Sequence, residues 1–249
     1  MSNSVNEILI IGLGLIGASI AKASKEKGII VHGYDIKKSV IKTAIEDNVI
    51  DQSIDSIEGL NNKSLIDKID LVIISVSPKA TQEIINQIPN LLNTEITITD
   101  TSSVKGHLKI SSISNFILSH PIAGSDKSGI ASLDQNLFEN KKTIICNPNN
   151  VEDVHLKKLT DFWKYAMQMR VSEMSVKEHD LLFAMTSHLP HLVSFALVNI
   201  ILNTSSIKNI EDFTVSQSLI CQVFLTLRIF QCLKQEDPVS MKITEMEEL

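Results

Sequence analysis

Three polar clusters carry the side chains of this chain that could do chemistry. Each follows an apolar segment: Asp100–Gly106 (DTSSVKG), Ser119–Gly129 (SHPIAGSDKSG) and Thr186–His191 (TSHLPH). Together they supply imidazole, hydroxyl, carboxylate and ammonium groups. Because an imidazole titrates near neutral pH, this combination indicates acid–base chemistry on a small molecule.

The position of the clusters along the chain predicts that they line one cleft. The first two follow segments that we expect to be strands of a parallel sheet, and the carboxyl ends of such strands meet where ligands bind. The third lies between two expected helices and would close the cleft from a second domain.

A glycine-rich turn indicates a dinucleotide site. Ile8–Gly17 (ILIIGLGLIG) has the order strand, G-x-G-x-x-G, helix. Gly12 allows the tight turn, Gly14 lets the backbone approach a pyrophosphate, and Gly17 lets the helix pack on the strand. The alternative is a glycine turn in a fold that binds nothing. We expect the cofactor to contact Gly12, Leu13, Gly14, Leu15, Ile16 and Gly17.

Asp35 sets the expected cofactor. It follows the second expected strand, where a carboxylate can bind both ribose hydroxyls of NAD and repel a 2′-phosphate. Lys37 and Lys38 are close enough in the sequence to tolerate that phosphate. NAD is therefore expected, and NADP is possible.

Segments typical of strands alternate with segments typical of helices. This order predicts an α/β fold with a Rossmann-type, doubly wound, mostly parallel sheet. The expected strands are Glu7–Ile11, Ile29–Tyr34, Leu71–Val76, Ile96–Thr99, Phe116–Leu118, Thr143–Cys146 and Gln168–Val171. The expected helices of this domain, residues 1–172, are Ala18–Lys27, Lys37–Asp47, Pro78–Ile88 and Val151–Met167. A smaller all-helical domain, residues 173–249, would begin with Val176–Ser187 and Leu189–Leu202.

Composition excludes several classes of protein. Hydrophobic residues make up 43% of the 249, and a net charge of −6 disfavours nucleic-acid or anionic-membrane binding. Cys146, Cys221 and Cys232 match no disulfide or metal spacing, which favours a reducing cytoplasm and no metal site. Met1–Asn6 lacks the order of a signal peptide, and Leu192–Leu202 is too short to span a bilayer.

Four motifs together resemble the prephenate/arogenate dehydrogenase family. They are G-L-G-L-I-G, D-x-x-S-V-K-G, H-P-I-A-G-x-[DE]-K-S-G and S-H-L-P-H, in this order, and the resemblance covers about residues 7 to 203. It implies a Rossmann domain, a helical dimerisation domain and therefore a homodimer. It also implies NAD(P)-dependent oxidative decarboxylation of prephenate in tyrosine biosynthesis. Arogenate, which differs by an amino group on the side chain, remains an alternative substrate.

The resemblance also assigns roles to particular residues. His120 would act on the substrate hydroxyl, and Ser103 would bond to His120 or to that hydroxyl. The residues expected to bind substrate, or to place positive charge near its carboxylates, are Ser187, His191, Lys127 and Lys105.

Each of these residues also has a simpler explanation. His120 could be a loop histidine without a role, and the pair Asp126–Lys127 could be a surface ion pair. Ser187, His188 and His191 could cap the helix that begins near Leu189. His188 and His191 resemble a metal pair, but no further ligands complete such a site.

The family pattern is not followed after about residue 204. The family has a G-G-[FL]-R-D-x-T-R segment there, whereas this chain has no glycine after Gly129 and only Arg228 in its last part. A truncation, a frameshift or a divergent tail would each produce this. We expect an incomplete helical domain, association through apolar helix faces and reduced activity. The alternative from another class is a weakly active NAD-binding remnant.

Overall fold

The computed structural model describes residues 5–57, 63–92, 94–111, 113–125 and 127–203. The chain divides into two compact units, Met1–Asp180 and Leu181–Leu249. We predicted a boundary near residue 172; the units meet after Asp180, inside a helix. The expectations for the segment after residue 203 lie outside the described residues.

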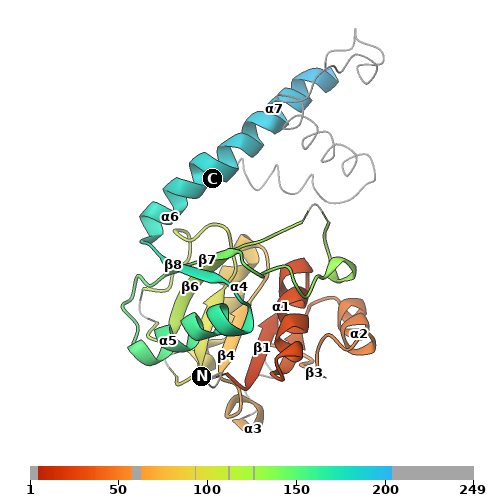
Figure 1. Ribbon diagram of the computed structural model, residues 1–249, viewed down its shortest axis with the longest axis vertical. Coiled ribbons are helices and arrows are strands. Elements are labelled where there is room, and N and C mark those ends of the chain that lie inside the picture. Colours follow the sequence, from red (N-terminus) through yellow and green to blue (C-terminus); the bar gives the residue numbers. More distant parts are fainter. Residues whose placement is uncertain (1–4, 58–62, 93, 112, 126, 204–249) are drawn as a thin grey trace. The chain divides into compact units, whose positions relative to one another are not determined.

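The first unit is built on one eight-stranded sheet with the order β3-β2-β1-β4-β5-β6-β7-β8 (Figure 1). All neighbouring strands are parallel except β6 and β7. The predicted α/β class with a mostly parallel sheet is confirmed. The strands are β1 (Glu7–Ile11), β2 (Ile30–Tyr34), β3 (Gln52–Ser53), β4 (Leu71–Ile74), β5 (Thr97–Asp100), β6 (Phe116–Ile122), β7 (Lys142–Cys146) and β8 (Arg170–Glu173).

Four of the helices described in this unit begin and end within a few residues of the predicted positions, whereas the short helix Lys63–Ile66 was not predicted. Ser77 accepts a hydrogen bond from the N–H of Ala80 and caps α4, whose first residue is Pro78; a proline fits there because that N–H has no partner within the helix. The helices are α1 (Leu15–Glu26), α2 (Lys38–Glu46), α3 (Lys63–Ile66), α4 (Pro78–Gln87) and α5 (Asp153–Asp161), which continues as a π-helical turn, Phe162–Ala166. Short 3₁₀ turns occur at Pro89–Leu91 and Ile130–Ser132.

Alternate strand residues face opposite sides of the sheet, and both sides are apolar. Ile8, Ile10, Leu71 and Ile73 belong to one buried cluster with side chains of α1 and of the turn after α5. Figure 1 shows α1 and α5 on the near face of the sheet. Burial on both faces explains why these strands are continuous apolar runs.

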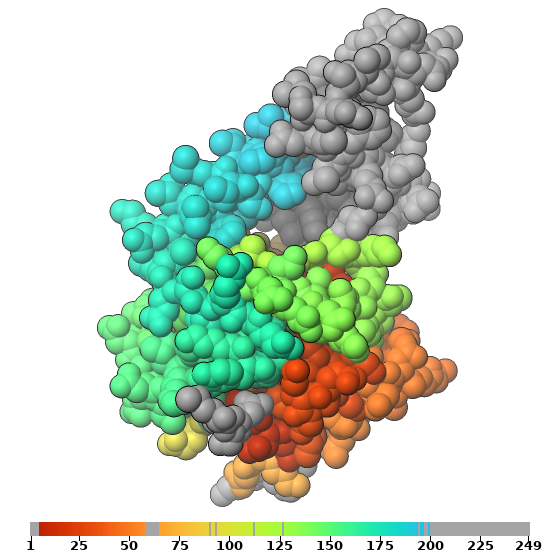
Figure 2. Space-filling model, in the orientation of Figure 1, coloured from red at the N-terminus to blue at the C-terminus, as the bar shows by residue number. Residues whose placement is uncertain are grey.

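The strand β6 is longer than predicted. We expected Phe116–Leu118, with Ser119 to Ile122 in a loop, but β6 continues to Ile122 beside β7. On the side that faces β5, β6 is paired only as far as Leu118, and the rest of the strand is an edge there. Pro121, which has no N–H to donate, is tolerated at such an edge. After β6 the chain crosses over α1, where the N–H of Asp134 donates to the hydroxyl of Ser19 (2.9 Å) (Figure 2).

The second unit, as far as it is described, is helical. The helix α6 (Val176–Phe183) runs without interruption through a π-helical turn (Ala184–His188) into α7 (Leu189–Asn203). The predicted break near Leu189 is therefore wrong, and so is the alternative that Ser187 caps a new helix. Pro190 has no N–H to donate within the helix, and the π-helical turn ends two residues before it.

Candidate active site

Two of the three glycines in the turn after β1 have no space for a side chain, and the third faces open space. A Cβ on Gly12, whose φ is +95°, would lie 2.3 Å from the carbonyl oxygen of Ser75, and a Cβ on Gly17 only 1.9 Å from that of Gly12. A Cβ on Gly14 would meet nothing within 4 Å. Gly12 and Gly17 are thus required by packing. The open side of Gly14 lets a ligand approach the backbone at the start of α1.

Asp35 lies beside this turn and is held there by the backbone. One carboxylate oxygen accepts the N–H of Leu13 and the other accepts the N–H of Lys37, both at 2.9 Å. A carboxylate can accept about four hydrogen bonds, so both oxygens keep capacity for sugar hydroxyls. The residues at the turn therefore fit a dinucleotide with a free ribose.

The next loop begins with a buried ion pair. The Lys105 ammonium is 2.7 Å from Asp100 Oδ2 and 2.6 Å from the carbonyl oxygen of Ser119, and both charged side chains are 0% exposed. Burial lowers the pKa of Lys105, and the charge of Asp100 opposes that change. The expectation that Lys105 lies near substrate carboxylates is wrong, because its ammonium is enclosed by Asp100 and the backbone.

A chain of hydrogen bonds connects His120 to a histidine and an aspartate of α6. His120 Nδ1 is 2.9 Å from His179 Nε2, and His179 Nδ1 is 2.8 Å from Asp180 Oδ1. His179 is fully buried, whereas His120 is half-buried. Asp180 also accepts the N–H groups of Lys105 (3.0 Å) and Gly106 (2.7 Å). His120 therefore belongs to a defined network and is not an isolated loop histidine.

Burial and hydrogen bonding act in opposite directions on this chain. Burial lowers the pKa of His179, and Asp180 only partly offsets this. Burial would raise the pKa of Asp180, but hydrogen bonds from His179, Gly106 and Lys105 lower it overall. A neutral His179 beside an ionised Asp180 follows. Nearby, burial raises the pKa of the Cys146 thiol to about 11, so Cys146 is no nucleophile at neutral pH.

A capping box places His179 at the start of α6. Ser175 Oγ and the N–H of Ser175 lie 2.7 and 2.9 Å from Glu178 Oε2, and the N–H of Glu178 donates back to Ser175 Oγ (3.2 Å). These bonds from Ser175 lower the pKa of Glu178. The N–H of His179 then donates to the carbonyl of Ser175 (2.9 Å), which fixes the first turn.

The other predicted site residues make no described hydrogen bond to the network of His120, His179 and Asp180. Ser103 is exposed in the loop after β5 and makes no hydrogen bond to His120 among the described residues. Lys127 is exposed, with its N–H on Ser125 Oγ (3.2 Å); Asp126 lies outside the described residues. In the second unit, His191 Nδ1 donates to the carbonyl of Ser187 one turn earlier (2.8 Å).

Comparison with known protein families shows which family the chain belongs to. The nucleotide-binding domain of prephenate dehydrogenase matches residues 20–171, and the dimerization domain of prephenate dehydrogenase matches residues 175–220. The chain belongs to the prephenate dehydrogenase family. The resemblance inferred from four motifs is confirmed by this result.

Individual members of the family are similar over most of this chain. The prephenate dehydrogenase of Lactococcus lactis is 33% identical over 208 residues, which cover 78% of this chain and 53% of that protein. The cyclohexadienyl dehydrogenase of Zymomonas mobilis is 30% identical and covers 78% of this chain and 67% of its own. This chain spans about half the length of the first of these curated relatives.

A solved structure of the family also matches. The crystal structure of prephenate dehydrogenase from A. aeolicus, in complex with hydroxyphenyl propionate and NAD⁺, has a TM-score of 0.75 and 29% identity. The match covers 99% of this chain and 94% of that one. The Rossmann-type arrangement of the first unit is thus that of the prephenate dehydrogenase family.

Sequence reasoning missed two members of the network, His179 and Asp180, and it did not predict that Asp100 pairs with Lys105. His179 stands eight residues before Ser187, in a stretch that we predicted only to be a helix. An adjacent histidine and aspartate behind an S-x-x-E capping box was the available signal. It was not sufficient, because the partners lie 59 and 75 residues away in the sequence.

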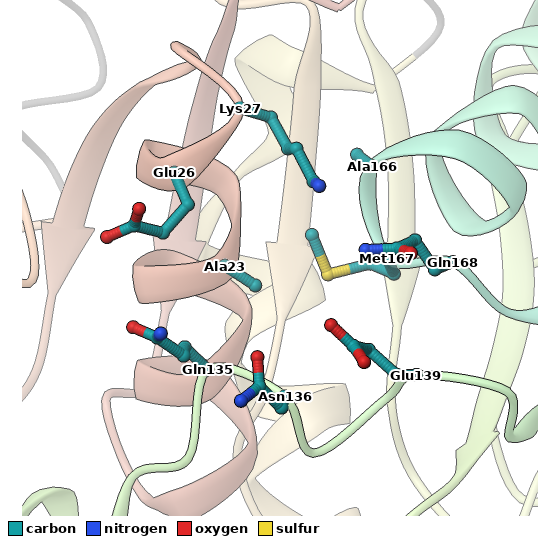
Figure 3. A pocket seen from close by; sticks show the side chains of 9 residues that line it. All are labelled: Ala23, Glu26, Lys27, Gln135, Asn136, Glu139, Ala166, Met167 and Gln168. Atoms are coloured by element: carbon teal, nitrogen blue, oxygen red, sulfur yellow. The ribbon is translucent and has the colours of Figure 1, made fainter.

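A separate cavity lies at the other end of α1. It is about 260 Å³ and lies between the end of α1, residues 135–139 and the turn after α5 (Figure 3). Lys27 and Glu139 project into it, beside Met167. The cavity begins at Ala23, six residues beyond Gly17 and about 9 Å further along α1. It is not part of the candidate active site.

Neither a membrane helix nor a metal centre occurs among the described residues. A bilayer-spanning helix would have to be longer and more continuously apolar than any of theirs. Nor do three or more of their histidine, cysteine, aspartate or glutamate side chains gather as a metal site would require.

Proposed function

We propose that the chain is an NAD-dependent prephenate dehydrogenase, which converts prephenate to 4-hydroxyphenylpyruvate and CO₂ in tyrosine biosynthesis. The observation that carries the proposal is the position of His120, half-buried at the end of the hydrogen-bonded chain through His179 and Asp180. An imidazole held in this way suits proton transfer at neutral pH. Family membership supplies the substrate class.

The glycine turn and the catalytic loops belong to one edge of the sheet. Thr101 Oγ1 donates to Ser75 Oγ (3.2 Å), and Ser75 is the residue whose carbonyl packs against Gly12. The loop after β5 is thus tied to the loop after β4 beside the dinucleotide turn. This arrangement supports placing substrate between that turn and His120.

The residues of the chain then have distinct tasks. NAD⁺, when bound, supplies the hydride acceptor. His120 takes the proton of the substrate hydroxyl while the carbon that bears it loses hydride. The bond to the ring carboxylate breaks, CO₂ leaves, and its electron pair makes the ring a phenolate. His120 returns the proton to the phenolate oxygen, so the imidazole ends as it began. Ser103 is assigned to orient the substrate hydroxyl.

The deciding experiment is steady-state NADH formation by the purified chain. It compares prephenate with arogenate, and NAD⁺ with NADP⁺. We expect prephenate with NAD⁺ to give the highest kcat/KM. Higher kcat/KM with arogenate would make the chain an arogenate dehydrogenase. NAD⁺ binding without turnover of either substrate would make it an NAD-binding remnant.

Asp35→Ser is expected to change the cofactor preference. The substitution removes charge-assisted bonds to the ribose, worth about 1.5–3 kcal/mol, or roughly ten- to a hundredfold in NAD⁺ affinity. It also removes the repulsion of a 2′-phosphate, which Lys37 and Lys38 could then bind. Titration of both cofactors measures the ratio. Tighter binding of NADP⁺ than NAD⁺ by the unmodified chain would contradict the assignment.

Ser187→Ala and His191→Ala are expected to weaken prephenate binding but not NAD⁺ binding. Both side chains lie one turn apart on the helix of the second unit, which the family resemblance assigns to the substrate. Loss of one hydrogen bond to a charged substrate costs about 1.5–3 kcal/mol. KM for prephenate and Kd for NAD⁺ are measured for each variant. Equal losses in both would indicate a structural role.

We also propose that Lys127 lies near a substrate carboxylate and that the protein is cytoplasmic.

We further propose that the chain forms a homodimer. The dimerization domain of the family matches residues 175–220, and large apolar side chains are exposed on the helix of the second unit. Such a surface is typical of an association interface. Light scattering gives the mass in solution; a monomer at micromolar concentration would contradict the dimer. The exposed residues are Leu181, Leu182, Met185, Leu189, Leu192 and Val193.

A further inference from the structure

We propose that His179 and Asp180 are positioning residues that hold the proton of His120 on Nδ1 and so leave Nε2 as the basic atom. The inference rests on the proposed function, in which His120 takes the hydroxyl proton of the substrate. It concerns the two residues behind His120, which the four sequence motifs do not include.

The chain of bonds starts from a fixed carboxylate. Asp180 Oδ1 accepts the N–H of Lys105, and Oδ2 accepts the N–H of Gly106. A Cβ on Gly106 would lie 2.8 Å from Oδ2, so a side chain at this position would displace the carboxylate. Two backbone donors of one loop thus fix the orientation of the carboxylate and favour its ionised form.

The ionised carboxylate determines the tautomer of His179. An ionised carboxylate only accepts hydrogen bonds, so the proton between Asp180 Oδ1 and His179 Nδ1 belongs to the imidazole (2.8 Å). His179 is fully buried, and burial lowers its pKa, so the ring is neutral. A neutral ring with its proton on Nδ1 has a lone pair on Nε2.

That lone pair in turn determines the tautomer of His120. His179 Nε2 is an acceptor, so the proton in the 2.9 Å contact belongs to His120 Nδ1. The ring planes are inclined by 64° with centroids 5.1 Å apart, an edge-on arrangement. A neutral His120 protonated on Nδ1 carries its lone pair on Nε2. This is the form required to accept the proton from a substrate hydroxyl.

The charges around His179 favour temporary protonation of His120. Among the described residues, the charged groups that act on His179 are Asp180, Lys105 and Asp100, and its ring partner is His120. Lys105 and Asp100 neutralise each other, which leaves Asp180 as the unbalanced negative charge. A proton taken up by His120 makes this cluster neutral overall. The carboxylate of Asp180, which is partly exposed, therefore stabilises the imidazolium through the buried ring of His179.

The first test measures tautomers without any substrate. Proton–nitrogen correlation spectra of the imidazole rings distinguish Nδ1–H from Nε2–H. We expect Nδ1–H on both His120 and His179 in the unmodified chain, and a shift of His120 toward Nε2–H in His179→Leu. Nε2–H on His120 in the unmodified chain would overturn the proposal. This result stands even if prephenate proves not to be the substrate.

The second test is rescue by a conservative variant. The side-chain oxygen of Gln can replace Nε2 of His179 as an acceptor, whereas Leu cannot. We expect kcat on prephenate to fall about 10²–10³-fold in His179→Leu, with KM nearly unchanged, and to remain within about tenfold of the original in His179→Gln. Equal losses in the two variants would show that His179 only fills space, and would overturn the proposal.

A matched control separates this role from general loss of a buried histidine. His155 is also buried and bonds to Thr97 Oγ1 (2.9 Å), outside the network. His155→Gln is expected to keep kcat. If His179→Leu does not fold, as judged by NAD⁺ binding, the spectra of the unmodified chain and the kcat of His179→Gln decide. If the unmodified chain turns over neither substrate, the proposed function fails, while the spectra still judge the tautomer.

Discussion

His120→Asn is expected to reduce kcat on prephenate by about 10²–10⁴-fold, the usual contribution of an acid–base group. The amide nitrogen of Asn occupies nearly the place of Nδ1, so the bond to His179 Nε2 can be kept. The atom that is lost is Nε2, and the amide cannot replace it as a base. The variant therefore removes the base while leaving the hydrogen-bonded chain behind it.

The measurement is steady-state kinetics on prephenate together with Kd for NAD⁺. The Kd should be nearly unchanged, because the N–H groups of Leu13 and Lys37, and not His120, hold Asp35 beside the glycine turn. His155→Asn is the control, since it replaces a buried histidine outside the site. Turnover of His120→Asn close to that of the unmodified chain would refute the assignment of His120 as the base.

The dinucleotide half of the site was predictable because its determinants are local. The turn from Gly12 to Gly17 needs small residues for reasons of backbone geometry, and Asp35 follows the next strand at a short distance. Strand and helix positions followed from apolar periodicity within windows of about ten residues. None of these inferences required knowledge of which segments pack together.

The remaining parts of the site depend on contacts between distant segments. A histidine before a proline is typical of a loop, yet pairing with β7 keeps His120 in a strand. The sequence shows the charge of Lys105 but not that Asp100 encloses it. The three-residue network from His120 to Asp180 spans 60 residues and includes a helix start. Tertiary packing decided each of these features, so composition and spacing could not.

The D-x-x-S-V-K-G motif has a structural explanation that follows from these contacts. Its first residue, Asp100, and its lysine, Lys105, form the buried ion pair that closes the loop after β5. Its glycine, Gly106, together with the N–H of Lys105, receives the carboxylate of Asp180. The loop therefore joins the sheet to the residues behind His120, and its integrity should affect the whole unit.

Lys105→Met is accordingly expected to reduce the free energy of unfolding by about 3–5 kcal/mol, the usual cost of leaving one partner of a buried ion pair without the other. Methionine fills much of the same volume, so lost packing contributes little. Asp100 keeps the N–H groups of Ser102 (3.0 Å) and Ser119 (3.3 Å) but loses its counter-charge. Denaturant unfolding of the chain, followed by circular dichroism, measures the change.

Two further variants show whether the cost comes from charge. Lys157→Met removes an ammonium from an exposed pair with Asp161, one turn along α5, and should leave stability nearly unchanged. Adding Asp100→Asn to Lys105→Met removes the stranded carboxylate and should recover most of the lost stability, because a buried pair replaced on both sides is often close to neutral. If the double variant is no more stable than Lys105→Met alone, the loss arises from packing of the Lys105 stem, and the ion pair is not what closes the loop.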